Sequence, residues 1–163
     1  IDTLNVGIVW ASGYRDKPDA LRFYHKKSCP LLEFLPLLDI PHVQLYSLQV
    51  GGNASDIDEF KACDRLHNWS PFIRDFTDTA ALVAQLDLVI AVDTAIVHLA
   101  GAMGKPVWNL LPFAPDWRWF LEREDTPWYP TMRLFRQSER GNWAEVIKRV
   151  SAALRSFPKG LNN

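Results

Sequence analysis

Short apolar runs, separated by segments with helical features, are what most constrains the fold of this chain. The run at 88–92 (LVIAV) holds no polar residue, and the runs at 5–10, 43–48 and 106–111 are mostly apolar. Strands buried on both faces of a parallel sheet have this pattern, whereas half-exposed strands alternate apolar and polar residues. Strands that alternate with helices pair through right-handed crossovers. We therefore predict an α/β fold with a doubly wound, Rossmann-like parallel sheet of five or six strands.

The segments between these runs carry helix signals of different strength. Pro30 suits the first turn of a helix, and Pro36 lies inside the leucine stripe that follows, so this helix should be short or kinked. Thr77 or Asp78 is expected to cap a helix. Further expectations are a polar loop over 14–28, a short helix over 54–63, a strand over 66–69, a helix from 95 to 102, one or two helical turns over 117–123, a strand over 132–135 and an amphipathic helix over 142–157.

Length and composition indicate one ordinary globular domain. The chain has 163 residues, of which 48% are hydrophobic and 23% are charged. Its 18 basic and 19 acidic residues give a net charge of −1, so we expect no nucleic acid partner. No apolar run approaches the roughly 20 residues of a membrane span. The first residue is Ile1, so we expect a piece of a longer protein, with a domain over 1–157 and a frayed tail over 158–163.

The cysteine content indicates a reducing compartment. Cys29 and Cys63 are the only cysteines, and no second pair completes a zinc site. Two structural thiols in a chain with a good core are typical of a cytoplasmic protein. We expect neither a bound metal nor a cofactor.

In doubly wound sheets, ligands bind outside the carboxyl ends of the strands. This rule selects three places, at 11–13, 49–52 and 93–95. The third opens a helix, whose first N–H groups have no partners within the helix and suit a phosphate.

Three side chains near the start of that helix can take part in phosphate binding. Asp93 or Thr94 can cap the helix, the Thr94 hydroxyl can donate to a phosphate oxygen, and His98 lies one turn further on the same face. The alternative is purely structural: Asp93 and Thr94 cap the helix, and His98 packs against Trp108.

Two other segments can approach the same strand ends. Gly13, beside Ser12, allows close approach of the backbone to a ligand, although such a pair is often only a turn. Lys26 and Lys27 can reach an anion over the strand ends, or can be solvated surface lysines. Neither the three-glycine dinucleotide fingerprint nor a P-loop is present, which disfavours a nicotinamide or ATP-hydrolysing site.

A long aromatic connection over 112–130 is a further candidate. Trp117 can stack on a nucleobase, and Arg118 can bind a phosphate. The alternative is that the aromatic residues form a small hydrophobic core of their own.

Taken together, these segments resemble glycosyltransferase family 9, the heptosyltransferases. The specific part is 93–108 (DTAIVHLAGAMGKPVW), which is similar to the donor-site motif of that family. The segments 7–11 (GIVWA), 110–119 (LLPFAPDWRW) and 128–135 (WYPTMRLF) support the match. The chain is still more similar to heptosyltransferase-like C-terminal domains of bacterial proteins that carry tetratricopeptide repeats upstream.

The resemblance implies the C-terminal half of a GT-B fold, which binds a nucleotide-sugar donor. The family donor is ADP-heptose, and the transfer inverts the anomeric centre without a metal. The general base would come from an N-terminal acceptor half that this chain lacks, so the chain alone is expected to be inactive. That half is then an expected partner, as are proteins bound by upstream repeats.

The resemblance also assigns roles by position. Lys27 and His98 match residues that stabilise the leaving diphosphate, and Gln49 stands where the family contacts the nucleoside with an acidic residue. The expected donor-binding residues are Ser12, Gly13, Gln49, Asp93, Thr94, Ala95, Trp117 and Arg118.

Two rival functions are considered beside the enzyme. The first is a non-catalytic nucleotide-sugar-binding or scaffold module of a tetratricopeptide-repeat protein. The second, a flavodoxin-like or receiver domain, requires an acidic pocket or a flavin loop that the sequence does not show.

Overall fold

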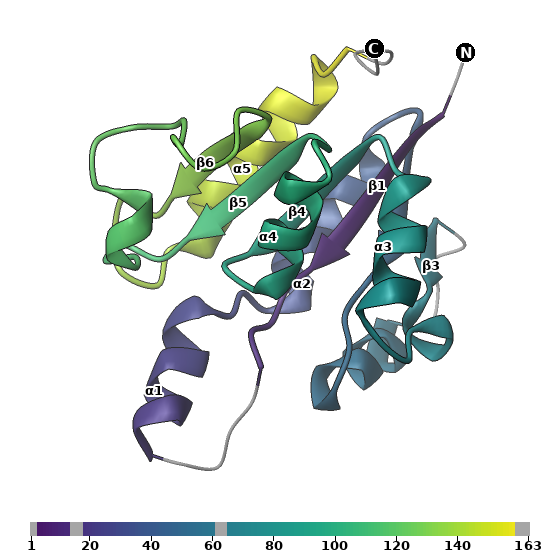
Figure 1. Ribbon diagram of the computed structural model, residues 1–163, viewed down its shortest axis with the longest axis horizontal. Helices are drawn as coiled ribbons and strands as arrows, with labels where there is room; N and C mark the ends of the chain where they lie inside the picture. Colours follow the sequence, from purple (N-terminus) through teal and green to yellow (C-terminus); the bar gives the residue numbers. More distant parts are fainter. Residues whose placement is uncertain (1–2, 14–17, 61–64, 159–163) are drawn as a thin grey trace.

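The computed structural model describes residues 3–13, 18–60 and 65–158. These residues form a six-stranded, all-parallel sheet in the order β3-β2-β1-β4-β5-β6 (Figure 1). The strands are β1 (Leu4–Val9), β2 (Val43–Ser47), β3 (Leu66–Asn68), β4 (Leu88–Val92), β5 (Val107–Leu111) and β6 (Met132–Arg136). This order is that of a classical dinucleotide-binding sheet, so the predicted doubly wound, Rossmann-like fold is confirmed.

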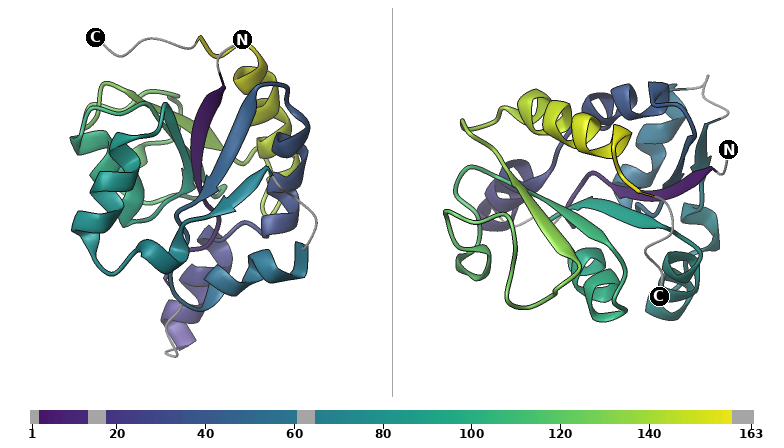
Figure 2. Two further views of the ribbon diagram at one scale, coloured as in Figure 1. Left: turned by 90° about the vertical axis from the view of Figure 1, so that its right-hand side faces the viewer. Right: turned by 90° about the horizontal axis from the view of Figure 1, so that it is seen from above.

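Helices cover both faces of the sheet (Figure 2). The α-helices are α1 (Pro18–Lys27), α2 (Leu31–Phe34), α3 (Phe76–Ala84), α4 (Ala95–Ala102) and α5 (Trp143–Arg155). The 3-10 helices are η1 (Leu35–Asp39), η2 (Gly52–Phe60), η3 (Ser70–Phe72) and η4 (Trp117–Trp119). One face packs against α2, η1 and α5, and the other packs against α3, α4 and η4.

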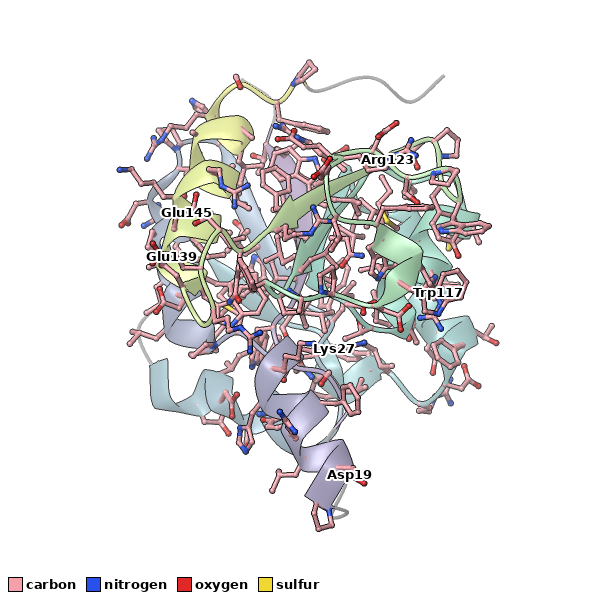
Figure 3. The ribbon with its side chains drawn as sticks, turned by 90° about the vertical axis from the view of Figure 1, so that its left-hand side faces the viewer. Asp19, Lys27, Trp117, Arg123, Glu139 and Glu145 are labelled. Atoms are coloured by element: carbon pink, nitrogen blue, oxygen red, sulfur yellow. The ribbon has the colours of Figure 1, made fainter. Side chains whose placement is uncertain are left out.

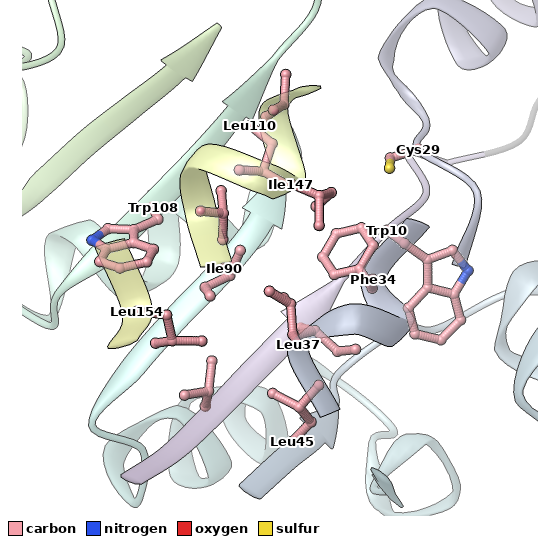
Figure 4. Packing of buried hydrophobic residues seen from close by; sticks show 14 of the residues in the cluster. Trp10, Cys29, Phe34, Leu37, Leu45, Ile90, Trp108, Leu110, Ile147 and Leu154 are labelled. Atoms are coloured by element: carbon pink, nitrogen blue, oxygen red, sulfur yellow. The ribbon is translucent and has the colours of Figure 1, made fainter. Parts of the chain in front are cut away.

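Strand β4, which has the clearest sequence signal, lies between two hydrophobic cores, one on each face of the sheet. All five residues of β4 are buried, because successive side chains point to opposite, equally covered faces. Ile90 belongs to the cluster under α5, whereas Val89 and Ala91 belong to the cluster under α4. Figure 4 shows the first cluster, in which Trp108 and Ile147 lie over the sheet.

The polar loop predicted over 14–28 is wrong where the structure describes it, because Pro18–Lys27 is helix α1. Pro18 opens this helix, Asp19 lies in its first turn, and basic residues occupy its last turn. These are favourable helix ends. The segment has few apolar residues because α1 extends away from the sheet, with Phe23 60% exposed (Figure 1).

The cap of α3 is also corrected. Asp75, not Thr77 or Asp78, is the capping residue, and its carboxylate accepts from the N–H groups of both Thr77 and Asp78. The helix therefore begins at Phe76, before either of the expected caps. Aspartate is a strong capping residue, so the cap has the expected kind of side chain at an earlier position in the chain.

Other expectations hold closely or fall outside the described residues. The helix after Pro30 is short and becomes 3-10 at Leu35, with Pro36 in its first turn. The short helix at 54–63 is the 3-10 helix η2, while 61–64, including Cys63, lies outside the described residues, as does most of the tail.

Cys29 is a buried free thiol whose pKa is raised by burial. Within the described part, none of the helices combines the length and apolarity needed to cross a membrane.

Candidate functional site

The sheet order places a crevice between the carboxyl ends of β1 and β4. The chain leaves β1 toward β2 on one side and leaves β4 toward β5 on the other, and ligands bind in open α/β sheets at this switch point. A cavity of about 320 Å³ opens there. It is lined by Ala11 and Gly13 after β1, by 48–50 after β2, by 73–76 at the start of α3, and by 94–96 at the start of α4.

The first turn of α4 faces this cavity. Thr94 occupies the cap position in an extended conformation, and the side chain of Ala95 is exposed. The expected side-chain cap is not formed: neither Asp93 nor Thr94 accepts from the helix, and the Thr94 hydroxyl is buried without a partner. Among the described residues, no side chain caps the N–H groups of Ala95 and Ile96, and both residues line the cavity at the positive end of the helix; these two groups are called the open amides of α4.

Lys27 reaches the strand ends from α1. Its Nζ lies 2.7 Å from Asp93 Oδ2, with 24% of the lysine side chain and 4% of the aspartate side chain exposed. Figure 3 shows Lys27 near the body of the protein and Asp19 at the far end of the same helix. The pair neutralises a buried carboxylate beside the open amides of α4, so an anion placed there does not meet an unpaired negative charge.

His98 is held by the long connection after β5. Its Nδ1 lies 2.9 Å from the Tyr129 hydroxyl, and its ring stacks on Trp119 at 5.4 Å between centroids. Burial lowers the pKa of His98, Asp93 opposes this change, and Arg118 and Lys27 add to it. Burial therefore favours the neutral form of His98, and the charged groups that act on its pKa all belong to the predicted site or to its adjoining loop.

The structural alternative in which His98 packs against Trp108 is wrong. Trp108 points to the opposite face of the sheet, where it contacts Phe135 and Phe157. The side chains of β5 alternate between faces, and α4 covers the other one.

Ser12 and Gly13 lie at the mouth of the crevice. The Ser12 N–H donates to Ser28 Oγ at 3.0 Å, and the two hydroxyl oxygens are 3.4 Å apart. Gly13 is exposed, and a Cβ there would meet no atom within 4 Å. Two hydroxyl groups therefore stand together at this edge, the second from a residue that sequence reasoning missed.

Gln49 lines the cavity, but the protein itself uses its polar atoms. Its Oε1 accepts from the N–H groups of Trp10 and Ala11, and its Nε2 donates to the carbonyls of Ala11 and Val50. With 4% of its surface exposed, Gln49 fixes the backbone at the end of β1. These hydrogen bonds give Gln49 a structural role, and its expected contact to a nucleoside stays a prediction.

The aromatic connection divides into an inner and an outer part. Trp119 is fully buried and Tyr129 is half-buried, and both pack into the main core under α4 instead of forming a separate small core of the connection, whereas Trp117 is 74% exposed. Arg118 pairs with Asp116 at 3.2 Å and lies 5.8 Å from the ring centre of Trp117. Trp117 and Arg118 are thus available at the rim and do not line the crevice.

Tyr129 is the residue of this site that sequence reasoning missed most clearly. One signal for it was present: Gly101 lies inside α4, where glycine is unfavourable. A Cβ at Gly101 would lie 2.7 Å from Tyr129 Cγ, so the glycine makes room for the ring that holds His98. An unexplained glycine one turn after a candidate histidine indicates such a close approach.

The start of α4 and the residues around it lie in a segment that matches a known protein family. Residues 74–115 match the model of glycosyltransferase family 9 (heptosyltransferase). The expected resemblance to glycosyltransferase family 9 is confirmed. The matched segment contains α3, β4, α4 and β5, and so includes the open amides, Asp93 and His98.

Solved heptosyltransferases share the fold. The structure of E. coli ADP-heptose lps heptosyltransferase II superposes with a TM-score of 0.68 at 15% identity, over 94% of this chain and 46% of that chain. E. coli heptosyltransferase WaaC with ADP gives 0.60 at 14% identity, over 91% and 43%. WaaC with ADP-2-deoxy-2-fluoro heptose gives 0.66 at 11% identity, over 94% and 44%. The chain thus has the fold of one half of a GT-B enzyme.

A curated relative is closer in sequence and much longer. Protein FlbA of Caulobacter vibrioides is 35% identical over 156 residues, which are 93% of this chain and 25% of FlbA. The family 9-like domain therefore spans a quarter of this relative and just under half of the heptosyltransferases it resembles.

Proposed function

We propose that this chain binds the nucleotide-diphosphate sugar, of the ADP-heptose type, for an inverting, metal-independent glycosyltransferase of the cytoplasm. The observation that carries the proposal is the open first turn of α4, facing a cavity at the switch point with Lys27 beside it. Two of the similar heptosyltransferase structures hold ADP or an ADP-sugar, which supports a ligand of this class.

In this proposal, the nucleoside occupies the cavity of about 320 Å³ and the diphosphate lies against the N–H groups of Ala95 and Ile96. Cleavage of the glycosyl–phosphate bond leaves its electron pair, and a negative charge, on the diphosphate. The amides at the start of α4 and the ammonium group of Lys27 stabilise that charge as it develops.

His98 acts in this proposal as a neutral hydrogen-bond donor. In this arrangement Nδ1 accepts the hydrogen bond of the Tyr129 hydroxyl, so the ring proton lies on Nε2 and can be donated to the diphosphate. The acceptor hydroxyl needs a general base, and we assign that base to a facing domain, since the chain spans 46% of a heptosyltransferase.

One backbone substitution tests the amide site directly. Ala95 is the first residue of α4, where proline is tolerated, and Thr94 before it is already extended (φ −138, ψ 173), as a residue preceding proline should be. Ala95→Pro thus removes one N–H at little cost to the fold. Calorimetric titration with ADP, GDP, UDP and their sugars should show about tenfold weaker binding of the preferred ligand. Ala95→Val adds bulk but keeps the N–H and is the matched control.

The outcomes separate the possibilities. Equal affinity of wild type and Ala95→Pro would contradict the amide site, and failure of every nucleotide to bind the folded wild type would contradict the proposed function. A weakening in Ala95→Val as large as in Ala95→Pro would assign the effect to bulk alone.

The second candidate is a non-catalytic nucleotide-sugar-binding or scaffold module. The pairing of Lys27 with Asp93 favours it, because the cation nearest the amides already has a carboxylate partner. Donor binding without transfer when a facing acceptor domain is present would support the module, and transfer would support the enzyme.

A further inference from the structure

A second cavity, of about 720 Å³, lies between α1 and the loops that follow β5 and β6. Helix α1 contributes Arg22, Phe23 and Lys26 to its lining, and the loops contribute Phe113 and Arg140. Both loops leave the carboxyl ends of their strands, so this cavity and the crevice open at the same edge of the sheet. The proposed donor site does not include this cavity.

The cations of this cavity are unusual in lacking partners. Among the described residues, only five lysine or arginine side chains have neither a hydrogen bond nor an ion pair, and three of them line this cavity. The five are Arg22, Lys26, Arg140, Lys148 and Arg155. Asp19 is the one carboxylate among the described lining residues, so the cavity carries an excess of positive charge.

The walls between these cations are apolar. Phe23 and Phe113 are 60% and 44% exposed, and the guanidinium of Arg140 lies 5.7 Å from the centre of the Phe113 ring. Concave sites with apolar walls and a few convergent polar groups are typical of small-molecule binding. Unpaired cations over such walls favour an anionic ligand with an apolar face, such as the ring of a sugar.

The position of the cavity relates it to the donor site. Lys26, on its wall, is followed by Lys27, whose Nζ contacts Asp93 beside the start of α4. This inference rests on the proposed function, in which the sugar leaves the diphosphate beside Lys27 and the start of α4. The cavity therefore lies next to the reacting end of the donor.

We propose that this cavity is a second subsite, which binds a sugar bearing a carboxylate or a phosphate. Arg22, Lys26 and Arg140 bind the anionic group, and the two phenylalanines contact the sugar ring. The subsite discriminates anionic from neutral sugars by charge.

Three probes of matched shape test this subsite on the 163-residue chain: glucuronate, glucose 6-phosphate and glucose. We expect one or both anionic sugars to bind, with glucose at least about tenfold weaker. Arg140→Gln and Lys26→Gln should each weaken the anionic sugar about tenfold. The matched controls are Lys148→Gln and Arg155→Gln, which remove unpaired cations from α5, outside the cavity. A preference for one anionic probe identifies the carboxylate or the phosphate as the ligand group.

Several results would overturn the subsite: binding of glucose as tight as that of both anions, no binding of either anion, or equal weakening by the control substitutions. A titration with ADP in parallel separates this inference from the donor site. Anionic sugar binding without nucleotide binding would leave the subsite standing and refute the proposed function, and the reverse result would refute the subsite alone. Thermal melts verify folding, and Arg22→Gln replaces any variant that does not fold.

Discussion

At the scale of the residue, the ion pair between Lys27 and Asp93 has two consequences. It stabilises the fold, because Asp93 is almost fully buried, and it keeps a cation beside the open amides of α4. A buried carboxylate that loses its partner is costly, whereas a pair removed as a whole is often neutral. The two consequences can therefore be separated by substitution.

Lys27→Ala should destabilise the chain by about 2–4 kcal/mol, since it leaves Asp93 buried and unpaired. Adding Asp93→Asn should restore much of that loss. Urea denaturation measures both, and Lys26→Ala, at a neighbouring lysine without a hydrogen bond or ion pair among the described residues, should change stability by less than about 0.5 kcal/mol. Equal stability of Lys27→Ala and Lys26→Ala would show that the pair does not contribute.

His98 predicts a pH dependence of donor binding. Its pKa is lowered in the free chain, mainly by burial, and a bound diphosphate adds negative charge nearby, which raises it again. A group whose pKa rises on binding takes up a proton with the ligand, so affinity increases as the pH falls through the bound-state pKa.

ADP-glucose suits this measurement because its diphosphate diester does not titrate near neutrality. Its affinity should increase from about pH 8 to about pH 5.5 in the wild type and should change less in His98→Gln. The His98 ring signals in NMR titrations should report the same rise in pKa on binding. Parallel pH profiles for the two proteins would mean that His98 does not face the ligand.

At the scale of the element, α4 contains a glycine that is unfavourable in a helix but allows the Tyr129 ring to pack closely against it. Gly101 costs helix stability, yet a Cβ there would lie 2.7 Å from the Tyr129 ring. The glycine therefore lets the long connection lie close enough to place a hydroxyl 2.9 Å from His98 Nδ1.

Gly101→Ala should destabilise the chain by about 1–3 kcal/mol, although alanine is the better helix former, because the ring of Tyr129 must move. It should also weaken ADP binding, as His98 loses its orientation. Gly13→Ala, at a glycine with open space around its Cβ position, is the control for stability. A Gly101→Ala chain more stable than wild type would show that Tyr129 adjusts freely.

The sequence predicted the sheet well because its strands are buried on both faces and therefore need almost purely apolar residues, as β4 shows. It failed for α1, which extends from the sheet and so lacks the apolar stripe by which packed helices are found. The strand-end rule located Asp93, Thr94 and Ser12, since it depends on local order along the chain. Tyr129 could not be located this way, because its contact with His98 joins residues distant in sequence.

At the scale of the whole molecule, one edge of the sheet holds the features that bear on anion binding. The net charge of −1 does not favour anions, so their binding depends on the local placement of open amides and cations. On that edge, Lys27 and the start of α4 form one site, and the cavity with Arg22, Lys26 and Arg140 forms the next.

This arrangement predicts binding without turnover by the chain alone. Asp93, the buried carboxylate at the crevice, is already paired with Lys27, so it is a poor general base, and inverting transfer needs one to deprotonate the acceptor. Incubation of the chain with its preferred nucleotide-sugar should release no free nucleotide above the uncatalysed rate, although calorimetry detects binding. Transfer or hydrolysis above that rate by the folded chain would mean that the chain supplies its own base, and the facing domain would then be needed for acceptor binding alone.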